Sequence, residues 1–150
     1  MKIGLLSYRS HPYSGGQGIY IKHLSKALKD LGHHVSVLSG PPYPELDSEI
    51  ELIKIPSLGM FETDDRAKIF SPKLFLSPLD LYEWFTVMTG GFPEPYTYGK
   101  RAYNFLKKNK DSFDVILDNQ CLATSLIDIQ DMFPLAVTIH HPITKDHKLE

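Results

Sequence analysis

Short apolar runs recur along the chain, and a polar, glycine-rich or proline-containing break follows each of them. The first run, at residues 3–7, shows no alternation of polar and apolar positions, and it leads directly into a loop rich in Gly, Ser and Pro. This pattern is typical of a parallel strand that is covered on both faces. The same reasoning predicts further strands at residues 34–38, 50–55, 115–117 and 136–139.

Helical periodicity fills most of the stretches between these runs. Residues 19–31 are predicted to form a helix that ends before Gly32, because glycine commonly follows the last turn. The apolar residues that we expect to pack this helix on the sheet are Tyr20, Leu24, Ala27, Leu28 and Leu31. Further helices are predicted at residues 95–110, where a basic end suits the helix dipole, and around residues 122–130.

The alternation of strands and helices continues from end to end. It predicts an α/β protein with a Rossmann-like, doubly wound parallel sheet. We expect one domain over residues 1–150, because neither an internal repeat nor a low-complexity linker interrupts the sequence.

The stretch at residues 72–88 is helix-like and rich in large apolar side chains. It fits a buried helix, a lid over an acceptor, or an interfacial surface that touches a membrane. Helical stripes of this kind are most often buried, so the pattern favours the core. The residues concerned are Leu79, Leu81, Tyr82, Trp84, Phe85 and Met88.

Composition excludes some classes of protein. With 150 residues, 42% of them hydrophobic, the chain is long enough to bury one substantial core. Its formal net charge of −2 provides no general attraction for nucleic acid, which requires clustered Lys and Arg. The single cysteine, Cys121, cannot form an internal disulfide, and the N-terminal apolar run is too short for a signal peptide or a membrane span. We therefore expect a cytoplasmic location.

A glycine-rich loop connects the first predicted strand to the first predicted helix. Gly15 and Gly16 stand just before the helix, where backbone amides can approach a phosphate. A flexible turn that needs positive φ explains the same glycines equally well. NAD binding is disfavoured, because the loop has only two of the three fingerprint glycines and the second strand ends in Ser39 and Gly40 instead of an acid. Neither a P-loop motif nor a GxSxG motif is present.

His140 follows the last predicted strand and should lie at the carboxyl edge of the sheet, where open α/β folds bind ligands. A histidine there can donate a hydrogen bond or move a proton near neutral pH, although a purely structural histidine is also consistent with the sequence. A metal site that combines His140 with His141, Asp146 and His147 is disfavoured, because adjacent residues on extended backbone point apart.

Five segments together resemble the N-terminal domain of family 4 glycosyltransferases, which have the GT-B fold. They are residues 2–6, 14–20, 24–38, 114–120 and 136–142. Their order and spacing match closely, and the resemblance spans essentially the whole chain apart from residues 56–88.

The resemblance implies that Gly15 and Gly16 approach the diphosphate of a nucleotide-sugar donor, with Gln17 just inside the helix. It also implies that His140 contacts the donor sugar near the reacting carbon. The expected reaction is transfer of a hexose from a nucleoside-diphosphate sugar to a hydroxyl acceptor, with retention at the anomeric carbon. Neither a cofactor nor an obligatory metal is implied.

On the acceptor side, the resemblance implies roles for Lys145, His141, Asn119 and Gln120. Many relatives have a histidine where this chain has Asp118 and Asn119, so that part of the acceptor wall is altered. The acceptor would be a sugar or a lipid-linked molecule. Membrane contact stays open, because no amphipathic helix rich in Lys and Arg stands out.

In this family a second, donor-binding domain follows the first. We therefore expect residues 1–150 to be a truncated N-terminal half that lacks the donor-binding domain and is inactive alone. The alternative is a free-standing binding module that pairs with a separate donor-domain chain. The sequence does not specify the sugar, the nucleotide or the acceptor.

Overall fold

The computed structural model describes residues 1–60 and 69–140. Within these residues, five parallel strands form one sheet in the order β3-β2-β1-β4-β5. The strands are β1 (Lys2–Ser7), β2 (His34–Ser39), β3 (Glu51–Lys54), β4 (Val115–Asn119) and β5 (Leu135–Thr138). Each coincides with one of the apolar runs, so the predicted α/β fold with a Rossmann-like parallel sheet is confirmed.

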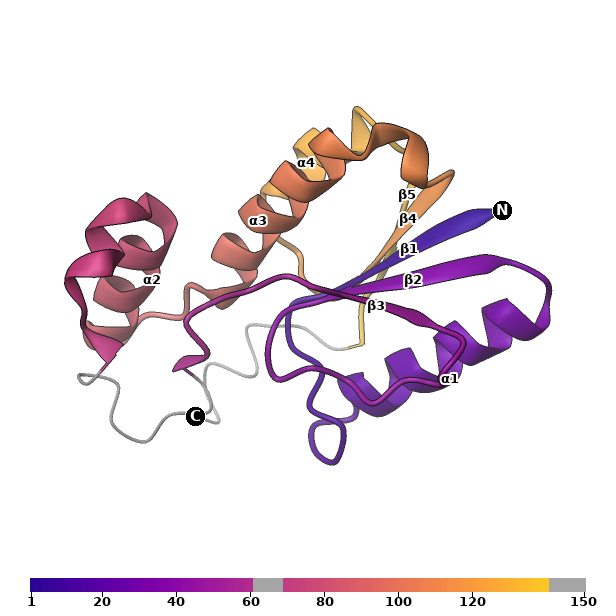
Figure 1. Ribbon diagram of the computed structural model, residues 1–150, viewed down its shortest axis with the longest axis horizontal. Coiled ribbons are helices and arrows are strands. Elements are labelled where there is room, and N and C mark those ends of the chain that lie inside the picture. The colour runs from indigo at the N-terminus through magenta and orange to yellow at the C-terminus, as the bar shows by residue number, and fades with distance from the viewer. Residues whose placement is uncertain (61–68, 141–150) are drawn as a thin grey trace.

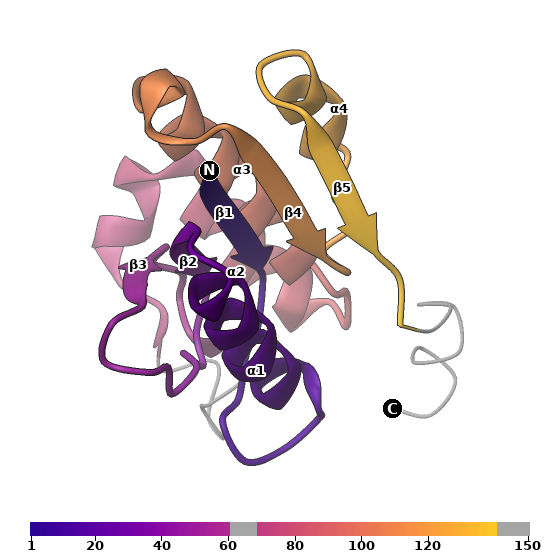
Figure 2. The same ribbon diagram turned by 90° about the vertical axis from the view of Figure 1, so that its right-hand side faces the viewer.

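Helices cover both faces of the sheet (Figure 1). α1 (Gln17–Asp30) lies on one face, while α3 (Glu94–Lys108) and α4 (Ser125–Gln130) lie on the other, and a short 3-10 turn, η4 (Lys110–Ser112), leads from α3 toward β4. Figure 2 shows the same layers from the side. Neighbouring residues of β1 serve different faces, since Leu5 belongs to the apolar cluster beneath α1 and Leu6 to the cluster beneath α3 and α4. This two-sided burial explains why the run shows no polar alternation.

The buried side of α1 differs from the predicted stripe. It consists of Gly18, Ile21 and Ser25, with Leu24 and Leu28 partly buried beside them. Tyr20, Ala27 and Leu31 are exposed, so their predicted packing on the sheet is wrong. Gly18, Ile21 and Ser25 follow one another at intervals of three and four residues, so they lie on the side of the helix that faces the sheet. Tyr20 does not fall on that side.

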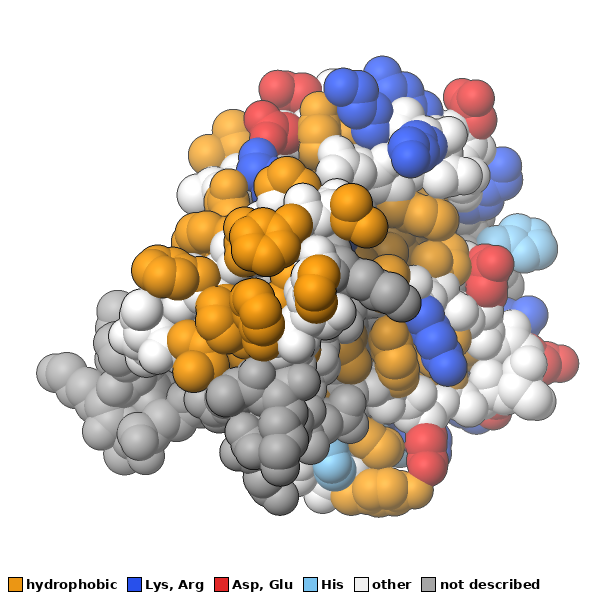
Figure 3. Space-filling model, turned by 60° about the vertical axis from the view of Figure 1, so that its left-hand side comes forward, with side chains coloured by type: hydrophobic (Ala, Val, Ile, Leu, Met, Phe, Trp, Pro, Cys, Tyr) orange, Lys and Arg blue, Asp and Glu red, His pale blue; other side chains and the backbone are white. Residues whose placement is uncertain are grey.

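α2 (Pro78–Met88) follows a short 3-10 helix, η3 (Pro72–Leu76), and stands to the side of the sheet (Figure 1). Its buried residues are Glu83 and Val87, whereas Tyr82, Phe85 and Met88 are exposed. The predicted core role of the aromatic stretch is therefore wrong for these three residues. The other members of the stretch, Leu79, Leu81 and Trp84, are partly buried. Figure 3 shows hydrophobic side chains gathered on this side of the molecule.

An ion-pair network determines which side of α2 faces the rest of the domain. Arg101 of α3 contacts two carboxylates of α2, with Nη2 2.5 Å from Asp80 Oδ1 and Nη1 2.7 Å from Glu83 Oε2. Glu83 also accepts a hydrogen bond from the backbone amide of Leu58 at 3.3 Å. Because a buried carboxylate is costly without partners, the acidic side of α2 must face α3, and the aromatic side is left outward.

Bilayer-spanning helices need a long apolar stretch, and none of the helices in residues 1–60 and 69–140 has one.

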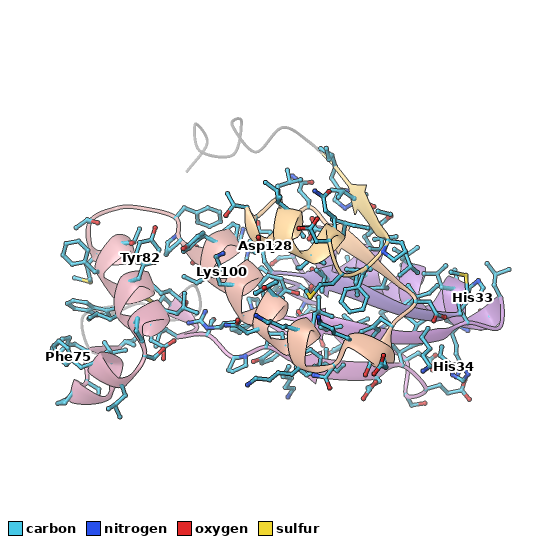
Figure 4. All side chains as sticks on the ribbon, turned by 90° about the horizontal axis from the view of Figure 1, so that it is seen from above. His33, His34, Phe75, Tyr82, Lys100 and Asp128 are labelled. Carbon is cyan, nitrogen blue, oxygen red and sulfur yellow. The ribbon has the colours of Figure 1, made fainter. Side chains whose placement is uncertain are left out.

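Arg101→Met should destabilise the fold by about 3–5 kcal/mol, because it leaves the Glu83 carboxylate buried without its cation. The matched control is Lys100→Met on the same helix. The Lys100 Nζ lies 3.4 Å from Asp128 Oδ2 at the surface (Figure 4), and its loss should change stability by less than about 1 kcal/mol. Urea unfolding measures both, and equal losses would show that Arg101 does not hold Glu83 in place.

Candidate functional site

The carboxyl ends of β1, β4 and β5 lie at one edge of the sheet, because β1 pairs in parallel with β4 and β4 with β5. The chain leaving β1 forms the glycine loop, the chain leaving β4 carries Gln120, and β5 leads to His140. The structure thus brings the described candidate residues to the edge where open α/β folds bind ligands. His33 and His34 lie at the opposite edge, before β2 and at its first residue (Figure 4).

The glycine loop presents its backbone to open space. Gly15 and Gly16 are exposed and adopt positive φ angles of 78° and 72°. A Cβ added to either glycine would meet no protein atom within 4 Å. Gly16 is the N-cap of α1, whose first turn holds no acidic residue and receives no side-chain cap. The positive end of α1 is therefore open to an anion.

Gly18 has a different role from the two glycines before it. It is buried, and a Cβ built on it would lie 2.2 Å from the carbonyl oxygen of His11. This close approach lets α1 begin against the loop that leaves β1. Glycine is needed here for packing, and at Gly15 and Gly16 for backbone conformation.

Tyr20 connects the glycine loop to His140. Its backbone amide donates to the carbonyl oxygen of Gly16 at 2.9 Å. Its ring meets the His140 imidazole edge to face, with ring centroids 4.6 Å apart and planes at 82°. Sequence reasoning missed this contact because it assigned Tyr20 to the buried stripe of α1. Its place four residues after Gly16, one turn into the helix, is the signal that could have indicated it.

Two polar side chains, one at the last residue of β4 and one directly after it, contact His140. Asn119 Oδ1 lies 2.7 Å from His140 Nε2, and Gln120 Oε1 accepts a hydrogen bond from the His140 backbone amide at 2.7 Å. Both side chains are buried, whereas His140 is exposed. Asn119 and Gln120 therefore contact His140, while their predicted acceptor-side role stays a prediction.

The other predicted site residues, His141 and Lys145, lie outside the described residues, as do Asp146 and His147. In the part of the chain that the structure describes, no three His, Cys, Asp or Glu side chains are grouped to hold a metal ion.

The carboxyl group of Asp118 lies beneath this turn. Burial raises its pKa from 3.8 to about 6, although hydrogen bonds to Oδ2 from the backbone amides of Leu122 and Cys121 favour the charged form. Oδ1 is buried and has no hydrogen-bond partner among the described residues. Burial also raises the pKa of the Cys121 thiol and the nearby Tyr98 hydroxyl well above their usual ranges, and the Asp118 charge adds to both shifts.

Tyr98 anchors the start of α3 to the ends of two central strands. Its hydroxyl donates to the carbonyl oxygen of Leu38 at 2.6 Å and accepts from the backbone amide of Ser7 at 3.1 Å. A small hollow next to Tyr98 lies between the ends of β1 and β2 and the first turn of α3. Its wall includes Tyr8, Arg9, Glu94 and Thr97. Ile55, Pro56 and Met60 also line it, and the space holds about one water molecule, so the hollow is too small for a sugar in this structure.

Comparison with known proteins gives one informative match. No protein-family model matches the chain. The chain is similar to the MMP alpha-(1->4)-mannosyltransferase of Mycolicibacterium hassiacum, with 49% identity over 152 aligned positions. The alignment covers 100% of this chain and 37% of the relative, so the chain spans little more than a third of that protein's length. Every residue of the candidate site lies within the aligned region.

Asp118→Asn should reduce the pH dependence of stability. The unfolded carboxyl loses its proton near pH 3.8 and the folded one near pH 6. Between these values the folded state binds more protons, so the stability from the protonated form declines as the pH rises, by on the order of 2 kcal/mol. Asparagine keeps an oxygen acceptor for the two amides and does not titrate.

Urea unfolding between about pH 4 and pH 7 measures this slope. Asp128→Asn, which changes a carboxylate half exposed on α4, is the control and should keep the slope of the unaltered protein. An unchanged slope in the Asp118 variant would show that this carboxyl group does not titrate across the range.

Proposed function

We propose that the chain is the N-terminal, acceptor-side part of a retaining glycosyltransferase of family 4 with the GT-B fold. It would help to move a hexose from a nucleoside-diphosphate sugar to a hydroxyl acceptor. The observation that carries the proposal is 49% identity to a mannosyltransferase along the whole chain. The same relative favours mannose as the transferred sugar.

The chemistry of the transfer requires stabilisation of negative charge. The bond between the anomeric carbon and the diphosphate oxygen breaks, and the anomeric carbon bonds to the acceptor oxygen, which releases its proton. Negative charge therefore collects on the departing diphosphate. The exposed backbone of Gly15 and Gly16 offers amide donors at the positive end of a helix dipole. Gln17 begins α1 beside them, and its own amide donates to the carbonyl oxygen of Gly15 at 2.8 Å.

His140 is the proposed contact to the donor sugar near its reacting carbon. Tyr20 links it to the glycine loop, so a donor with its diphosphate at Gly16 would bring its sugar toward the imidazole. The contact between these two elements supports assigning both to one substrate.

The acceptor is proposed to approach along the same edge of the sheet. His141 and Lys145 remain proposed acceptor-side residues. The proposal also includes a cytoplasmic location and a separate donor-binding domain, without which residues 1–150 would not turn over the donor.

Gly16→Val should abolish donor turnover in the full-length protein, because a branched side chain would occupy the space that the diphosphate needs. Gly32→Val is a matched control at the other end of α1. Gly32 also has positive φ, at 85°, and open space around its Cβ position, so it carries a similar backbone strain away from the site. Turnover of a panel of nucleotide sugars, beginning with mannose donors, measures the effect. Activity within a few fold of the Gly32 variant would remove the diphosphate role.

His140→Ala should lower kcat by about 100-fold or more if the imidazole acts at the reacting centre. Steady-state kinetics with the preferred donor measures the change, and a retained unfolding transition serves as the folding control. Unchanged turnover would assign His140 a structural role only.

A further inference from the structure

Three consecutive polar side chains are buried where the chain leaves β4. Asp118 and Asn119 are fully buried, and Gln120 is 1% exposed. Burial of polar groups costs free energy unless hydrogen bonds replace those made to water. Asp118 Oδ2 accepts hydrogen bonds from the amides of Cys121 and Leu122 and thereby closes the turn. The other two side chains both reach His140, which lies 20 residues further along the chain.

The backbone of this turn is strained in a way that favours these contacts. Gln120 has a φ of 55°, in the left-handed region that costs a residue with a Cβ about 1 kcal/mol or more. In this conformation its Oε1 accepts the hydrogen bond from the His140 amide at 2.7 Å. This bond holds the backbone just beyond β5, and the bond between His140 Nε2 and Asn119 Oδ1 holds the ring.

The hydrogen bond to Asn119 determines which ring nitrogen is available to a ligand. The structure turns the Asn119 amide so that Oδ1 faces His140 Nε2 at 2.7 Å, and an amide oxygen only accepts hydrogen bonds, so in this orientation Nε2 carries the proton. In the neutral imidazole Nδ1 then holds a lone pair, and it has no hydrogen-bond partner among residues 1–60 and 69–140. Tyr20 restricts rotation of the same ring through its edge-to-face contact.

We infer that Asn119 and Gln120 are positioning residues that hold His140 as the Nε2–H tautomer, so that Nδ1 accepts a hydrogen bond from a hydroxyl group of the substrate sugar. The inference rests on the proposed function for the identity of the ligand. The arrangement of the ring rests on contacts within this chain alone. His140 then acts as an acceptor toward the sugar, and the glycine loop supplies the donors toward the diphosphate.

Nitrogen-15 NMR of the histidine rings tests the tautomer directly. His140→Ala identifies the His140 signals among those of the seven histidines. Under conditions in which the imidazole is neutral, the unaltered protein should show His140 with Nε2 protonated and Nδ1 unprotonated. The reverse pattern, or a rapid average of the two tautomers, would overturn the inference.

Variants at Asn119 provide the matched comparison. Asn119→Ala should convert the His140 signals to a mixture of tautomers, while Asn119→Asp keeps an oxygen acceptor and should retain Nε2–H. Ser125→Ala removes another buried polar group from the same connection, and it should leave the signals unchanged. The spectrum of the unaltered protein decides the tautomer even where a variant fails to fold.

Kinetics of the full-length protein tests the contact with the sugar. Asn119→Ala should lower kcat by about 10-fold or more with little change in the KM for the donor, and Asn119→Asp should recover part of the loss. A donor that lacks the contacted hydroxyl should be poorer for the unaltered protein, whereas His140→Ala should barely distinguish it from the complete donor. Equal discrimination by both proteins against every deoxy donor would overturn the acceptor role of Nδ1.

The two readouts separate failure of this inference from failure of the proposed function. If the protein shows an ordered Nε2–H tautomer but turns over no nucleotide sugar, the glycosyltransferase proposal is wrong and the contact with the sugar is wrong with it. The role of Asn119 and Gln120 in holding the tautomer would then still be supported. If the protein transfers sugar but His140 shows a mixture of tautomers, the positioning role of Asn119 and Gln120 is wrong and the proposed glycosyltransferase function still holds.

Discussion

The parallel pairing of β1 with both β2 and β4 is the constraint on which the rest of the structure depends. Because the strands run in parallel, their carboxyl ends all lie at one edge of the sheet. The segments that follow β1, β4 and β5 therefore begin at that edge. Helices cover both faces because the chain adds β2 and β3 on one side of β1 and then β4 and β5 on the other, and right-handed connections that run in opposite directions lie on opposite faces. The glycine loop and His140 lie at the same edge for this reason, although more than 120 residues separate them in the sequence.

Polar groups at this edge are buried, and hydrogen bonds hold them in place. Asp118 supports the turn, Asn119 and Gln120 contact His140, and the Tyr98 hydroxyl joins α3 to the ends of β1 and β2. Buried polar groups are stabilising only when their partners are in place, so the edge is rigid wherever its bonds are complete. The exposed glycines at the start of α1 are the part of the edge that is left open.

Much of the fold could be predicted from the sequence, because strands covered on both faces leave uninterrupted apolar runs such as residues 3–7. The aromatic stretch of α2 could not, since its orientation follows from Arg101 on α3, and no local pattern reveals that Glu83 is the residue it buries. At the candidate site, His140 was located by its position after a strand. The contacts of His140 with Asn119 and Tyr20 depend on the order of the strands in the sheet and on the rotation of α1 about its axis. The hydrophobic periodicity of the sequence predicts neither of these.

The attachment of α2 has a consequence for how this protein can vary. The helix is tied to α3 through Arg101, and it contributes Val87 to the buried residues, while its aromatic side faces away from the sheet. Substitutions at the exposed Phe85 and Met88 should therefore have little effect on the β-sheet, whereas Tyr82 contacts Tyr96 of α3, with ring centroids 5.4 Å apart. The exposed surface of α2 can therefore change in sequence without loss of the fold, provided that Asp80 and Glu83 keep their contacts with Arg101.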